Sequence, residues 1–164
     1  MTQTRKKHIE ANTNKSYRLE IIETKPSGFY IQDLEGFVSK EVTIEDFEFR
    51  VNIITSTEKD NKLIKIEIEL NSFIVEKEGK LPEKNVFGIT STTIFRSPDI
   101  DKILDNNQQI IAPDEFMHKL FNICIGGIRG MLSVKLSNTD LQHITLPLLD
   151  FSNLKKKNRL PHSL

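Results

Sequence analysis

The sequence predicts an α+β fold in which a four-stranded antiparallel β-meander packs against a long C-terminal α-helix. Two patterns lead to this prediction. Apolar and polar residues alternate along several segments of the first hundred residues, which is the period of strands with one buried face. From Pro113 onward the apolar residues instead recur at helical spacing. A chain of 164 residues is also long enough to bury a core as one domain without disulfides or metals.

The four expected strands are separated by recognisable turn sequences. They cover residues 17–31, 47–53, 64–70 and 86–95. Pro26-Ser27-Gly28 predicts a turn or bulge inside the first strand, and the polar loop 57–62 predicts a hairpin between the second and third. Across Asn71 and Ser72 the alternation shifts so that Phe73 and Val75 take the apolar positions, a pattern typical of a β-bulge.

The expected helix begins at Pro113, which suits the first helical position, and the acidic Asp114 and Glu115 suit the positive end of the helix dipole. Its main apolar stripe consists of Met117, Leu120, Phe121, Cys124, Ile128, Met131 and Leu132. A second apolar side is formed by Phe116, Ile123 and Val134. One face of one helix is enough to cover a four-stranded sheet, so the second side predicts oligomerisation.

Three glycines interrupt this helix, and each costs about 1 kcal/mol relative to alanine. Gly126, Gly127 and Gly130 are tolerated where the bare backbone lets a sheet, a partner helix or another chain come close. A helix–helix contact between copies and packing on the sheet are weighed evenly. Together with Met131, the glycines are the predicted oligomer interface of a homodimer or homotetramer.

The composition and the motifs argue against nucleic-acid binding, metal binding and catalysis. The 23 basic and 23 acidic residues balance, whereas nucleic-acid-binding domains carry a basic excess. The single cysteine, Cys124, allows neither a disulfide nor a thiolate metal cluster. His118 lies about 240° around the helix from Cys124, so the two cannot form a nucleophile–base pair. No phosphate loop or metal-ligand spacing is present, and we expect no enzymatic activity, no cofactor and no metal.

The ends of the chain are predicted to lie outside the folded part. Residues 1–16 are expected to form a disordered tail, 17–151 a single domain, and 152–164 a basic tail too polar to pack. The N-terminus lacks the apolar stretch of a secretory signal, and no run approaches the ~20 apolar residues that span a bilayer. We therefore expect a cytoplasmic protein that does not insert into membranes.

The order of a four-stranded meander, a long amphipathic helix and an extended Leu-Pro segment resembles the SecB export chaperone family. Local matches support the resemblance at 66–75, Leu120-Phe121, Ile128, Met131-Leu132-Ser133, Leu146-Pro147 and Asp150-Phe151. It covers roughly residues 17–151. Three features differ from the family: the net charge is zero where the family is acidic, 152–164 is short and basic where the family has a second helix, and the connector 97–112 is longer than expected.

The resemblance implies an ATP-independent holdase that keeps unfolded or secretory clients soluble in apolar grooves between sheet and helices, with SecA as a further candidate partner. The first two differences argue against SecA docking. The residues expected to bind clients are Phe29, Ile31, Leu34, Phe73, Phe87, Leu146 and Leu148. Two alternatives stay open. One is a dedicated adaptor or antitoxin-type chaperone of the same fold with one fixed partner. The other is an enzyme or binding protein for a small molecule, held in a cup between the curved sheet and the helix; the lack of convergent polar residues on the inward faces argues against it.

Overall fold

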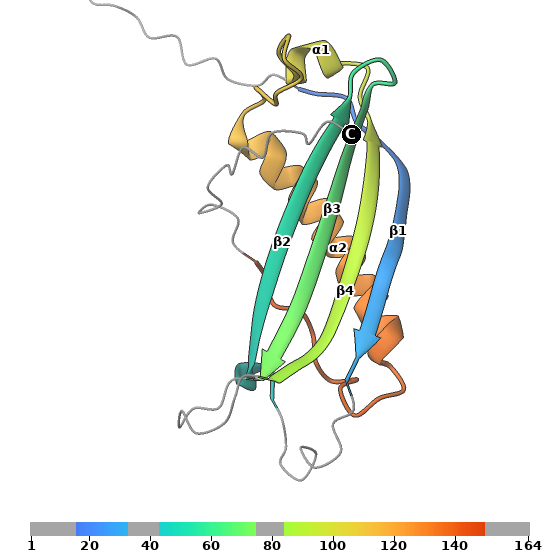
Figure 1. Cartoon of the computed structure of the whole chain (residues 1–164), viewed down its shortest axis with the longest axis vertical. Coiled ribbons are helices and arrows are strands. Elements are labelled where there is room, and N and C mark those ends of the chain that lie inside the picture. The colour runs from blue at the N-terminus through green and yellow to red at the C-terminus, as the bar shows by residue number, and fades with distance from the viewer. Residues whose placement is uncertain (1–15, 33–42, 75–83, 150–164) are drawn as a thin grey trace, which may run out of the picture.

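The computed structural model describes residues 16–32, 43–74 and 84–149. Its elements in chain order are β1 (Glu20–Ile31), the 3-10 turn η1 (Ile44–Asp46), β2 (Phe47–Glu58), β3 (Leu63–Ile74), β4 (Lys84–Arg96), the short helix α1 (Ile100–Ile103) and α2 (Asp114–Leu136). Figure 1 shows two layers, with the long strands side by side and α2 running behind them. The predicted α+β class, with an antiparallel sheet and a long C-terminal helix, is confirmed.

The strand order is β1-β4-β3-β2, which differs in part from the expected meander. β2, β3 and β4 do form a meander, but β1 pairs with β4 and so lies at the opposite edge from β2. Alternation in the sequence shows which side chains face the core but not which strand is the neighbour, and the meander was assumed from chain order. The consequence is that β1 and β2 are the two edges of the sheet.

The core lies between α2 and one face of the sheet. β3 presents every second residue to this face from Ile64 to Ile74, and all of them are buried. The buried face of α2 consists of Phe116, Met117, Leu120, Cys124, Ile125, Ile128, Leu132 and Leu136. α2 packs against β1, β3 and β4 but not to a comparable extent against β2. The helix therefore covers only part of the width of the sheet.

The predicted shift in alternation within β3 is wrong, because the extra residue sits on β4. Ser72 pairs with Phe87 while Phe73 pairs with Asn85, which leaves Val86 as the bulged residue. β3 itself keeps its alternation, so Ser72 is fully buried in the core and Phe73 lies on the opposite, outer face. There the Arg50 guanidinium stacks 4.3 Å from the centre of the Phe73 ring. The bulge expected at Pro26 and Gly28 in β1 is confirmed, and a second occurs between Ile21 and Glu23.

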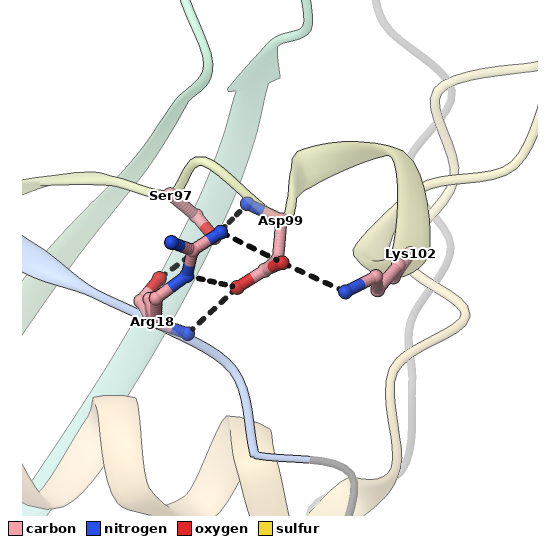
Figure 2. Close-up of polar contacts among 4 residues, drawn as sticks. All are labelled: Arg18, Ser97, Asp99 and Lys102. Carbon is pink, nitrogen blue, oxygen red and sulfur yellow. Dashed lines mark hydrogen bonds and ion pairs between the residues drawn. The ribbon is translucent and has the colours of Figure 1, made fainter.

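A polar cluster ties the start of β1 to the segment that follows β4 (Figure 2). The Arg18 backbone N–H and its Nε both donate to one Asp99 carboxylate oxygen, at 3.0 and 3.2 Å, and Lys102 Nζ donates to the other at 2.9 Å. The Ser97 hydroxyl donates to the Arg18 carbonyl at 2.9 Å. Only 6% of the Asp99 side chain is exposed. The hydrogen bonds from Lys102 and then from Arg18 hold the pKa of the Asp99 carboxyl far below its ordinary value of 3.8.

Asp99→Asn should lower the melting temperature at about pH 7, and its deficit should shrink in acid. An acid whose pKa is depressed by folding contributes its full stability above its unfolded pKa and loses it as the pH falls through the folded value. The wild type should therefore lose its advantage over Asp99→Asn progressively below the ordinary pKa of 3.8. Melting curves from neutral to acidic pH measure this. The matched control is Asp101→Asn, because the Asp101 side chain is 75% exposed and pairs with Lys59 at 3.4 Å. If the melting temperatures of both variants depend on pH in the same way, the Asp99 carboxylate does not have the proposed stabilising role.

Candidate polypeptide-binding surface

The helix-facing row of β2 is apolar but only half-buried. It consists of Phe47, Phe49, Val51 and Ile53, which we call the apolar shelf. The neighbouring row on β3 is fully buried, with Ile64, Ile66, Ile68 and Leu70 all at 0% exposure. The difference follows from the position of α2, which packs on the other three strands. One strand's width of apolar surface is therefore left partly open beside the core.

One end of the apolar shelf is aromatic. The rings of Phe47 and Phe49 lie 6.1 Å apart, and the Phe87 ring lies 6.2 and 6.3 Å from them, all within the range of favourable aromatic pairs. Phe87 is only 1% exposed and forms the floor of this group. Beside it on β3, the Ser72 hydroxyl is fully buried with no hydrogen-bond partner among the described residues. Large apolar side chains could extend this group from the open side.

The outer edge of β2 is regular along its whole length. Its 12 residues pair one to one with β3, from Phe47 opposite Ile74 to Glu58 opposite Leu63, without a bulge. In the described part of the chain no strand lies on its other side. β1, the other edge, carries two bulges and Pro26, features that commonly protect an edge from pairing. β2 is therefore the edge better suited to accept an additional strand.

The segment after α2 returns across the core. Residues 144–149, which we call the strap, run behind the sheet toward β2 (the orange to red trace in Figure 1). Ile144 and Leu146 are buried, whereas Leu148 is 90% exposed. Arg129 of α2 donates from Nε to the Leu146 carbonyl at 3.2 Å and from Nη2 to the Pro147 carbonyl at 2.7 Å. The strap is thus attached to the helix by an arginine and to the core by leucine and isoleucine side chains.

The residues predicted to bind clients are spread over several environments. Ile31 is 40% exposed and pairs with Phe87, and Phe29 is half-buried with Lys135 Nζ 5.6 Å from its ring centre. Phe87 and Leu146 are buried, Leu148 is exposed on the strap, and Phe73 lies on the outer face. Leu34 lies outside the described residues. The structure therefore buries Phe87 and Leu146 in the core cluster, with Phe87 against Phe47 and Phe49, and places Phe73 on the other side of the sheet.

Sequence reasoning missed the apolar shelf as a site. Its residues were correctly expected on a strand, with Phe47, Phe49, Val51 and Ile53 on one face. The sequence does not show the strand order, which places β2 at the edge of the sheet that α2 does not cover. No signal within β2 itself would have shown this.

The glycines of α2 have two different environments. A Cβ on Gly127 would lie 3.3 Å from the Thr24 methyl of β1, so Gly127 allows the helix to approach the sheet. A Cβ on Gly126 or Gly130 would meet nothing within 4 Å. Ile123 and Val134 are exposed by 42% and 74%. Because residues four apart share a helix face, Gly126 and Gly130 mark an outer face of α2 that makes no close contact within the described chain. Met131 is half-buried against the core.

The described residues show no candidate metal site, and the one cysteine among them is buried. No group of three or more His, Cys, Asp or Glu side chains in this part of the chain could hold a metal ion. Cys124 is buried, and this burial raises the pKa of its thiol, which keeps it protonated and poorly nucleophilic. Within the described ranges, no helix has the length and apolar character needed to cross a membrane.

No protein-family model matches the chain, and no curated protein matches it in sequence. The structure is similar to that of Rv1957 from Mycobacterium tuberculosis, a SecB-like chaperone in complex with a ChAD peptide from the Rv1956 HigA1 antitoxin. The TM-score is 0.48 at 11% identity, over 81% of this chain and 91% of that one. A protein of unknown function from Streptococcus agalactiae is similar with a TM-score of 0.32 at 13% identity, over 81% of this chain and 99% of that one. The proposal for the function of this chain is therefore based on the geometry of its own surface.

Proposed function

We propose that this protein is an ATP-independent chaperone of the SecB-like type that holds unfolded polypeptides on the apolar shelf. The observation that carries the proposal is the half-buried row of Phe47, Phe49, Val51 and Ile53 beside the unbroken edge of β2. An apolar surface next to an open strand edge fits an extended chain, which can hydrogen-bond through its backbone while every second side chain is buried.

The binding energy of this surface would come mainly from apolar burial. Burying a large apolar side chain is worth roughly 1.5–3 kcal/mol. Association and ordering cost several kcal/mol, so a client must bury several apolar residues along the shelf and the strand edge to bind tightly. Backbone pairing along β2 adds affinity without regard to sequence. This combination suits a holdase, because it selects extended apolar segments rather than one particular motif.

Charge plays a smaller part in the proposal. On the sheet, Glu48 pairs with Arg50 at 2.8 Å and Glu23 with Lys25 at 3.2 Å, so acidic groups there are locally balanced. Such exposed pairs contribute little and leave no strong field for a basic partner. Docking of a SecA-type motor on this face is therefore not included in the proposed function.

We further propose that the chaperone is a homo-oligomer built through the outer face of α2. Gly126 and Gly130 weaken the helix, yet a Cβ at either position would meet no atom within 4 Å among the described residues. In an antiparallel two-fold contact centred between them, Gly126 of one copy faces Gly130 of the other, and Ile123 falls near Ser133 and Val134. Such a self-complementary surface is what a two-fold dimer requires.

An aggregation assay tests the proposed holdase. Purified protein should suppress light scattering by two unrelated denatured clients without ATP, when about one binding site is present for each client chain. Protection of neither client by a stable oligomer would remove the general holdase. Tight binding to one natural partner alone would instead favour the dedicated adaptor, which uses the same surface.

A further inference from the structure

The strap has the same chemistry as the clients proposed for the apolar shelf. Residues 144–149 belong to no strand. Ile144 and Leu146 are 6% and 5% exposed, Leu149 is half-buried, and Leu148 points away from the core. Leu146 belongs to the buried cluster against which the residues of the apolar shelf also pack. An apolar segment of this chain therefore already lies on the helix side of the sheet, which is also the side that the apolar shelf faces.

Arg129 occupies the flank of α2 from which it can hold this segment. Gly127, two positions earlier, faces Thr24 of β1, and two residues correspond to about 200° around a helix. Arg129 therefore lies on the flank that faces away from β1, on the side of the uncovered strand β2. Its guanidinium reaches two consecutive carbonyls of the strap, those of Leu146 and Pro147, at 3.2 and 2.7 Å.

These bonds recognise backbone and not side chains. Arginine presents several N–H donors in a fixed planar fork, and carbonyl oxygens of any extended segment can accept them. Pro147 has no N–H and cannot donate to a neighbouring strand, so the strap is poorly suited to become a permanent part of the sheet. A segment held by side-chain burial and one arginine can leave without breaking a strand ladder.

We propose that the strap is an internal occupant of the client surface and that Arg129 is the latch that holds it. An arriving extended polypeptide displaces residues 144–149 and breaks the two hydrogen bonds that Arg129 donates to the strap. This inference rests on the proposed holdase function and adds to it a competition between the client and the chain's own strap. Weakening the latch therefore opens the surface.

The test compares Arg129→Ala with Lys119→Ala, which removes the same charge from an exposed position on the same helix. Three quantities are measured on the full chain: the rate of chymotrypsin cleavage after Leu148 and Leu149, the fluorescence of an apolar dye, and the Kd for a labelled, denatured client. Arg129→Ala should accelerate cleavage, raise dye fluorescence and tighten client binding about tenfold, the factor that corresponds to the loss of hydrogen bonds from a charged donor. Leu146→Ser loosens the strap without changing α2 and should act in the same direction.

The outcomes separate the latch from the holdase. Unchanged cleavage and dye binding in Arg129→Ala, relative to Lys119→Ala, would overturn the latch. Weaker client binding with a freed strap would overturn the competition, because the strap would then form part of the client site. If Arg129→Ala is cleaved faster but neither it nor the wild type binds a client, the latch is supported and the holdase function is overturned. Circular dichroism of each variant verifies that α2 is retained.

Discussion

Ile53→Thr is expected to weaken the binding of a denatured client about tenfold, whereas Ile54→Thr should leave it unchanged. The two neighbours differ in the face that they occupy. Ile53 belongs to the apolar shelf, while Ile54 lies on the outer face with 43% of its surface exposed. Threonine keeps the branching that strands favour but removes apolar surface, and a loss near 1.4 kcal/mol corresponds to a factor of ten. Fluorescence anisotropy of a labelled client measures the Kd.

The pair of variants also controls for folding. Ile53 packs on the core, so its melting temperature must be recorded beside the Kd and the assay run well below the transition. Phe49→Thr should reproduce the effect of Ile53→Thr from the aromatic end of the shelf. Equal losses of affinity at Ile53 and Ile54 would show that clients do not distinguish the two faces, which contradicts the proposed site.

Gly130→Leu is expected to convert the proposed oligomer into a monomer at micromolar concentration. A Cβ at Gly130 would meet no described atom within 4 Å, so we expect the folded monomer to accommodate leucine, which improves the helix by up to about 1 kcal/mol. In a close two-fold contact the same side chain would separate the two helices. Sedimentation gives the mass, and thermal unfolding gives the stability of the monomer.

One alanine variant, at the glycine of the same helix that faces the sheet, provides the control for this interface. Gly127→Ala brings a methyl group to 3.3 Å from Thr24, so it disturbs packing on β1 rather than association. It should therefore change stability and leave the mass alone. If Gly130→Leu keeps the wild-type mass and is simply more stable, the outer face of α2 is not the oligomer interface.

The sequence predicted the elements of the fold because their local patterns are strong. Alternation in Phe47–Ile53 and Ile64–Leu70 identified two strands and their core faces. Pro113 marked the start of α2 to within one residue, because the helix begins at Asp114. The prediction in β3 failed because Phe73 was taken as the next core residue. The bulge lies on the partner strand β4, and a bulge on a neighbour leaves no trace in the strand's own sequence.

The candidate site depends on contacts between distant residues, which local patterns do not contain. The shelf is open because β2 is an edge strand, a property of pairing rather than of composition. Arg129 and Pro147 are 18 positions apart and Arg18 and Asp99 are 81 apart, and nothing near any of them signals its partner. The glycines were singled out correctly as unusual, but only the structure separates Gly127 on the sheet from Gly126 and Gly130 on the open face.

Hydrogen–deuterium exchange along β2, with and without a denatured client, tests the central claim most directly. In an edge strand alternate backbone N–H groups point away from the sheet and exchange readily, and an added strand protects them. The account predicts that client binding slows exchange in Phe47–Glu58 more than anywhere else in the sheet. Client binding that leaves β2 unchanged and protects β1 or the outer face instead would contradict it.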